Sequence, residues 1–128
     1  MDPVAYLDTH VVAWLYAGRL DLLPTSVKES IESHALSISP MVELELQYLF
    51  EIGRVSEPAE NVCGILASTL GLSVCTFPFH EVVQVASRFS WTRDPFDRII
   101  TAQSEAARRT LITKDQTILK NCSLAKWE

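Results

Sequence analysis

Short apolar runs alternate with amphipathic segments along the whole chain, and this alternation limits the possible folds more than any other feature. The expected strands are 4–7, 35–39, 72–77 and 110–113, with an edge strand at 124–127. The expected helices are 11–17, one opened by Pro24, 40–52, 58–70, 80–89, 95–108 and 116–120. Strands of nearly continuous apolar character that alternate with helices predict an α/β fold. Its parallel sheet should be covered by helices on both faces.

Length and composition predict one domain over residues 1–128. The chain has no internal repeat and no linker long enough to divide it. We expect a cytoplasmic protein without a membrane anchor, since no apolar run approaches a membrane span and no signal-peptide pattern opens the chain. The odd number of cysteines, Cys63, Cys75 and Cys122, predicts reduced thiols.

The charge is unevenly distributed. Residues 1–87 carry 3 Lys or Arg against 11 Asp or Glu, whereas residues 88–128 carry 8 against 5. A surface that faces phosphate is therefore expected to draw on the last third of the chain. The candidates are Arg88, Arg93, Arg98, Arg108, Arg109 and Lys114, and for Arg108 and Arg109 a solvated helix face is the alternative.

Acidic residues follow the predicted strands. Asp8 comes directly after the first strand, Asp115 lies two residues past Thr113, and Asp97 lies in the first turn of the helix that Pro95 opens. In a parallel sheet, the ligand crevice lies beyond the carboxyl ends of the strands, where these acids would meet. Each of them has an alternative role as a helix cap, and we assign Asp94 mainly to capping.

Glu45 is harder to explain as a structural residue. On a helix over 40–52 its neighbours one turn away are Met41, Val42, Tyr48 and Leu49. We therefore predict that Glu45 interrupts the apolar stripe facing the sheet, where a lone carboxylate is costly unless it is paired or binds a metal. Glu43 is predicted to be a solvated acid of the first turn.

Four carboxylates at one edge of a sheet repel one another unless a cation neutralises them. Oxygen ligands select Mg²⁺ or Mn²⁺ rather than zinc, and such sites catalyse displacement at phosphorus. The chain has no P-loop and no GxGxxG stretch. The residues thus favour a metal-dependent phosphodiesterase with Asp8, Glu45, Asp97 and Asp115 as ligands.

The same residues resemble the PIN-domain nucleases, and among them the VapC-like toxins of bacterial toxin–antitoxin pairs. The resemblance spans the whole chain through four motifs in order. These are Tyr6-Leu7-Asp8-Thr9-His10, Ile38-Ser39-Pro40 leading to Glu45, Arg93-Asp94-Pro95-Phe96-Asp97-Arg98 with Ala102-Gln103, and Leu111-Ile112-Thr113-Lys114-Asp115. In the second motif Leu44-Glu45-Leu46 replaces a common Trp-Glu-Ile, which leaves Glu43 as the alternative acid.

The resemblance implies a three-layer α/β/α fold, RNA cleavage that depends on a divalent metal, homodimerisation and inhibition by a cognate antitoxin. It also implies supporting roles for Thr9, Asp94 and Thr113. We expect Arg98 or Arg93 to bind the substrate phosphate, and the alternative for either is an ion pair with Asp94 or Asp97.

Two other functions compete with this interpretation. One is a receiver-like domain with an aspartate phosphoacceptor, which the strand ending Thr76-Phe77-Pro78 disfavours because no acid follows it. The other is a binding domain without catalysis, in which the acids only cap helices.

We expect His10, His34 and His80 to be structural or surface residues. Trp14, Tyr48, Phe50 and Phe89 are expected in the core or a dimer interface rather than stacked on bases.

Overall fold

The computed structural model describes residues 3–128 and contains the predicted elements. The strands are β1 (Val4–Leu7), β2 (Ala35–Ile38), β3 (Ser73–Val74), β4 (Thr110–Ile112) and β5 (Ala125–Lys126). The helices are α1 (Thr9–Tyr16), α2 (Thr25–Ser33), α3 (Pro40–Glu51), α4 (Ala59–Leu70), α5 (Phe79–Ala86), α6 (Pro95–Ala107) and α7 (Gln116–Asn121), with a 3₁₀ turn η1 (Leu20–Leu22) that was not predicted. Strand β3 is shorter than the predicted 72–77, because it lies at the sheet edge with both residues exposed.

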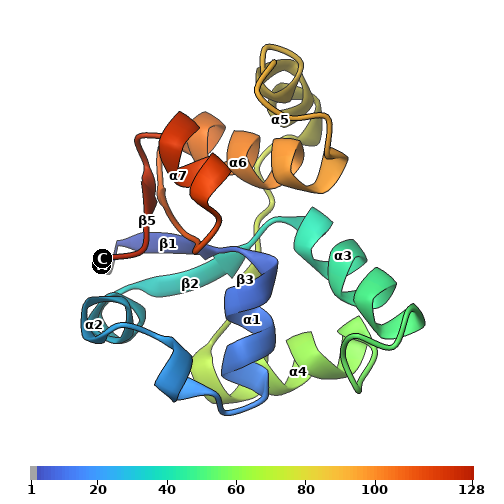
Figure 1. Cartoon of the computed structure of the whole chain (residues 1–128), viewed down its shortest axis with the longest axis vertical. Helices are drawn as coiled ribbons and strands as arrows, with labels where there is room; N and C mark the ends of the chain where they lie inside the picture. Colours follow the sequence, from blue (N-terminus) through green and yellow to red (C-terminus); the bar gives the residue numbers. More distant parts are fainter. Residues whose placement is uncertain (1–2) are drawn as a thin grey trace.

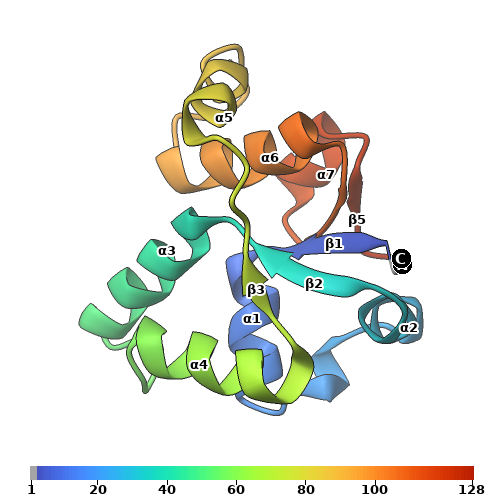
Figure 2. The ribbon, with the colours of Figure 1, turned by 180° about the vertical axis from the view of Figure 1, so that it is seen from behind.

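The five strands form one parallel sheet in the order β3-β2-β1-β4-β5, which confirms the predicted α/β class. Helices α6 and α7 lie on one side of the sheet, and α1, α2 and α4 on the other (Figure 1). The view from behind shows the same three layers, with α5 stacked outside α6 (Figure 2). Helix α3 contacts α1, α4 and α6, and so joins the two helical layers at the end of the strands.

The core has two parts. The main cluster fills both faces of the sheet and includes Leu7, Ile38 and Leu111. A smaller cluster of Val82, Ala86 and Ala102 lies between α5 and α6. Tyr48 and Phe50, which were expected in the core or in a dimer interface, are exposed in this chain. The second cluster explains why α5 packs on α6 and not on the sheet.

Proline and its capping residue fix where two helices begin. The Ser39 hydroxyl accepts the Met41 N–H and Pro40 starts α3, while Asp94 caps α6 and Pro95 starts it. At the other end of α4, Gly71 takes the left-handed conformation (φ +70°) that favours glycine. The predicted starts of α3 and α6, and the end of α4, are therefore confirmed.

The strand order reverses at β1. The chain runs outward from β1 to β2 and β3, and then returns to place β4 on the other side of β1. A crevice is expected at this reversal, beyond the carboxyl ends of β1 and β4.

The cysteines are free thiols, as predicted. Within residues 3–128 there is no helix with the length and apolar character needed to cross a membrane.

Candidate active site

Asp8 follows β1 at the reversal of the strand order and is 5% exposed. One carboxylate oxygen accepts the Thr9 N–H at 2.8 Å, and the other accepts the Thr113 hydroxyl at 2.5 Å. Burial raises the pKa of Asp8, and these two hydrogen bonds oppose that rise. Asp8 is thus the N-cap of α1 and also a buried carboxylate that is joined to the loop after β4.

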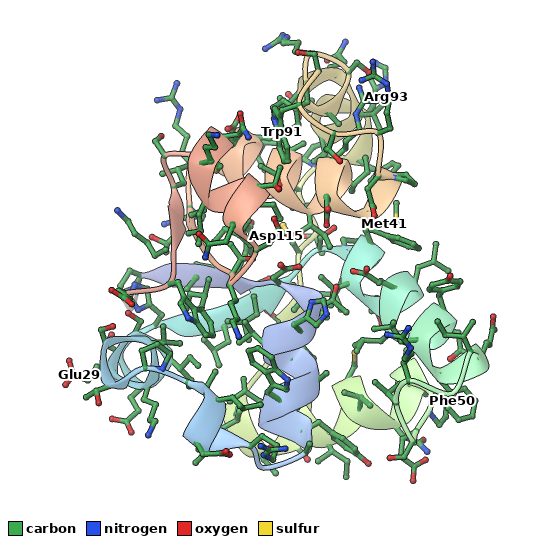
Figure 3. All side chains as sticks on the ribbon, in the orientation of Figure 1. Glu29, Met41, Phe50, Trp91, Arg93 and Asp115 are labelled. Carbon is green, nitrogen blue, oxygen red and sulfur yellow. The ribbon has the colours of Figure 1, made fainter. Side chains whose placement is uncertain are left out.

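Thr113 connects Asp8 to Asp115. Its buried hydroxyl donates to Asp8 and accepts the Asp115 N–H at 3.0 Å. The Asp115 side chain accepts the Ile118 N–H at 2.9 Å and caps α7, and its other oxygen accepts no hydrogen bond from residues 3–128. Figure 3 shows Asp115 between α7 and the start of α1. The loop after β4 therefore has its carboxylate beside the end of β1.

Glu45 is joined to the same network through Thr9, whose hydroxyl donates to the Glu45 carboxylate at 2.5 Å. Burial raises the pKa of Glu45, and the charges of Asp8 and Asp94 raise it further. Glu43 lies elsewhere, beside Glu60 and Cys63 in a cavity against α4. The structure therefore brings Glu45, and not Glu43, to Asp8.

The buried apolar stripe on α3 is narrower than the sequence predicted around Glu45. On α3 only Val42 and Leu46 are buried, and Tyr48 is 48% exposed. Glu45 lies at the edge of this narrow stripe, because α3 contacts the end of the sheet rather than its face. Burial and the charges of the neighbouring acids together make its position unusual.

Asp97 lies one turn into α6 and has a pKa raised to about 7. Burial is the largest cause, followed by the negative charges of Asp94, Asp115, Asp8 and Glu45. The carboxyl is therefore within electrostatic range of every other acid of the site. Asp94 itself accepts the Phe96 and Asp97 N–H groups at 2.8 and 3.1 Å, which confirms its capping role.

The acids are near one another but not yet arranged around a common point. In the described chain from residue 3 onward, no three acidic, His or Cys side chains are grouped tightly enough to hold one metal ion. Burial first, and then the charges of the other acids, raise the pKa of Asp97. The donor set consists of oxygen atoms, so it suits Mg²⁺ or Mn²⁺, and ligation would require side-chain rotation toward a shared centre.

The two arginines predicted to bind phosphate point away from these acids. The Arg98 guanidinium donates to the Ala86 and Phe89 carbonyl oxygens at 3.0 to 3.3 Å, so it holds the end of α5 against α6. Arg93 is exposed beside α5, away from Asp115 (Figure 3). The reason is geometric: the first turn of α6 directs Asp97 and Arg98 to different sides of the helix.

A group of aromatic and basic residues lies beside the acids. From the sequence, Lys114 was a candidate for facing phosphate, His10 was expected to be a structural or surface residue, and Trp14 was expected in the core or a dimer interface. The His10 and Trp14 rings lie 6.2 Å apart on α1, and the Lys114 ammonium lies 5.4 Å from the centre of the Trp14 ring. The i, i+4 spacing of His10 and Trp14 was the available signal, because it puts both side chains on one face of a helix.

Comparisons with known proteins agree with this architecture. The PIN domain family model matches residues 5–123. No curated protein sequence matches the chain.

Solved structures with the same fold include VapBC2 from Rickettsia felis bound to a DNA fragment from their promoter, with a TM-score of 0.66, 17% identity, and 98% of this chain and 97% of that chain covered. PAE2754 from Pyrobaculum aerophilum has a TM-score of 0.60 and 20% identity, over 98% of this chain and 91% of that chain. VapBC-1 from nontypeable Haemophilus influenzae has a TM-score of 0.58 and 15% identity, over 98% and 96%.

Proposed function

Because this chain belongs to the PIN-domain family, as the match over residues 5–123 shows, we propose that it is a metal-dependent endoribonuclease, the toxin of a toxin–antitoxin pair. The observation that carries the proposal is Asp97, whose carboxyl is affected by the charges of Asp8, Glu45 and Asp115. These four acids come from four separate segments of the chain. Such a cluster is unfavourable by itself and suits a site that binds a cation.

Asp8, Glu45, Asp97 and Asp115 would hold Mg²⁺ or Mn²⁺. When bound, the ion would activate a water molecule for attack on the RNA phosphodiester and stabilise the leaving oxygen. Thr9 and Thr113 orient the Asp8 and Glu45 carboxylates through their hydroxyl groups. Asp94 adds negative charge and fixes the start of α6, which carries Asp97.

The partner and the assembly are part of the same proposal. Two of the similar structures are VapBC complexes, which supports a cognate antitoxin as partner. Exposed apolar residues on and just after α3, including Leu44, Tyr48 and Ile52, support a homodimer. We further propose that residues 1–128 act as a single domain in the cytoplasm.

The test is RNA cleavage by purified protein in Mg²⁺, in Mn²⁺ and in EDTA. We expect Asp8→Asn and Asp97→Asn to abolish cleavage while the circular dichroism spectrum stays unchanged, and EDTA to abolish it in the unsubstituted protein. Glu45→Gln should lower kcat by at least 100-fold, whereas Glu43→Gln, on the same helix but facing α4, should retain activity. Full activity in Asp8→Asn or Asp97→Asn would contradict the site assignment.

A further inference from the structure

Three aromatic rings form a cluster beside the acids. His10 and Trp14 are one turn apart on α1 with ring centroids 6.2 Å apart, and Trp14 lies 6.0 Å from Trp127, which follows β5. His10 is exposed, and Trp14 and Trp127 are half-buried. Part of the cluster is therefore open to solvent.

The cluster begins at the acid site. His10 is the second residue of α1, the helix that Asp8 caps, and it follows Thr9, whose hydroxyl donates to Glu45. Lys114 directly precedes Asp115, and its ammonium group lies over the Trp14 ring. Within residues 3–128 the one ion pair is between Arg19 and Asp21. Lys114 is thus a cation that contacts an aromatic ring and forms no ion pair with the acidic residues of this described part of the chain.

A groove of about 500 Å³ leads away from this point between α1 and the connection from α3 to α4. His10 and Trp14 line one wall, Leu46 and Val62 contribute apolar surface, and Arg54 lies in the wall formed by the connection. Glu57 is its only acidic lining residue among those described. Positive charge and aromatic surface therefore continue from the acids into a groove.

We propose that this groove, with Lys114 at its rim, binds the single-stranded part of the RNA next to the cleaved phosphate. The proposal rests on the function proposed above. Lys114 and Arg54 bind flanking phosphates, and a base packs against the ring cluster of His10 and Trp14. A stacking surface combined with phosphate-binding cations is the usual design of single-strand sites, because every exposed base offers an aromatic face.

A polypeptide is less well matched to this surface. The groove begins at His10, the second residue of the helix that Asp8 caps. A ligand that reaches from the groove to the proposed cation would need a group that the cation can bind, and a phosphodiester has one. The Lys114 ammonium, over the Trp14 ring, would also complement the phosphates of such a strand. A duplex would hide its base faces from the aromatic cluster, which favours a single strand.

The test measures binding separately from cleavage. Fluorescence anisotropy is recorded for a fluorescein-labelled 12-nucleotide single-stranded RNA on Asp97→Asn protein, between 50 and 300 mM KCl. We expect Lys114→Gln to weaken binding and to reduce the slope of log K against log salt by about 0.7, the value for one phosphate contact on a single strand. Trp14→Leu should lower affinity roughly 5- to 150-fold with the slope unchanged. Lys28→Gln, which removes the same charge on α2, should change neither the affinity nor the salt slope.

Trp14 also packs against the core, so Lys114→Gln and Trp14→Phe keep the test decisive if Trp14→Leu fails to fold. Trp14→Phe should retain most of the affinity. If the unsubstituted protein cleaves RNA but all variants bind it equally, RNA binding in the groove is refuted and the nuclease assignment stands. A polypeptide would then be the better occupant of the groove. If no cleavage is seen but the salt slopes change as expected, RNA binding in the groove is supported and the nuclease activity is refuted.

Discussion

Two buried threonines allow a direct test of how the site is held together. Thr113 and Thr101 are both 0% exposed. The Thr113 hydroxyl donates to Asp8 and accepts the Asp115 N–H, whereas the Thr101 hydroxyl has no hydrogen-bond partner within residues 3–128. Valine has nearly the same shape as threonine, so replacing each residue with valine removes mainly the hydroxyl.

Thr113→Val should lower the free energy of unfolding by about 2.5–4 kcal/mol. A hydrogen bond to a charged group contributes about 1.5–3 kcal/mol, and the Asp115 N–H left without its acceptor costs a further ~1 kcal/mol because this group is only partly buried. Thr101→Val should instead be neutral or stabilise the protein by about 1 kcal/mol, because an unpaired buried hydroxyl is replaced by a methyl group.

The assay is urea unfolding at pH 8 in EDTA, followed by circular dichroism. Thr113→Val should lower the urea concentration at the unfolding midpoint by roughly 1–2 M, and Thr101→Val should leave it unchanged or raise it. Equal losses in the two variants would refute the reasoning, since the cost would then come from packing and not from the hydrogen bonds to the carboxylates.

Further predictions concern charge and backbone. Because the pKa of Asp97 is raised to about 7 in the folded state, its contribution to stability is complete at low pH and is lost as pH rises through 7. Unfolding free energy measured without metal should therefore fall from about pH 4 to pH 7 and level off above it, and Asp97→Asn should make this slope shallower by up to about 1.4 kcal/mol per pH unit. Thermal shift with 5 mM MgCl₂ should be larger at pH 8 than at pH 6, and an equal shift in Asp97→Asn would contradict ligation by this group. Arg108→Gly should stabilise the protein by about 0.5–1 kcal/mol in urea unfolding, because Arg108 ends α6 at φ +56°.

The sequence predicted most of the elements because local signals agreed with the fold. Pro40 and Pro95 start helices, Gly71 ends one, and the buried strands read as apolar runs. Strands β2 and β4 each end one residue before the predicted bound, and the edge strands β3 and β5 are shorter still. The largest error is at β3, whose two residues are exposed and pair with β2 alone. The 3₁₀ turn η1 was missed, since no capping side chain marks its start.

The candidate site was less predictable. The meeting of Asp8 and Asp115 follows from strand order, so the topology expected for a parallel sheet was enough to suggest it. The orientation of Arg98 depends on how α5 packs on α6, which its own motif does not encode. The cation over Trp14 likewise joins α1 to the loop after β4, and a contact between segments so far apart in sequence leaves no local periodicity.

The bond between Thr113 and Asp8 also determines when the site can exist. Its two residues are 105 positions apart, and β4 pairs with β1 only after the intervening sheet and helices have been synthesised. A growing chain that stops before β4 has Asp8 and Glu45 but lacks the strand that brings Asp115 to them. Long-range parallel pairing is also slow to form. The carboxylate cluster is therefore completed only after β4 has paired with β1, and a ribosome that translates this chain carries an incomplete site until β4 and Asp115 have emerged.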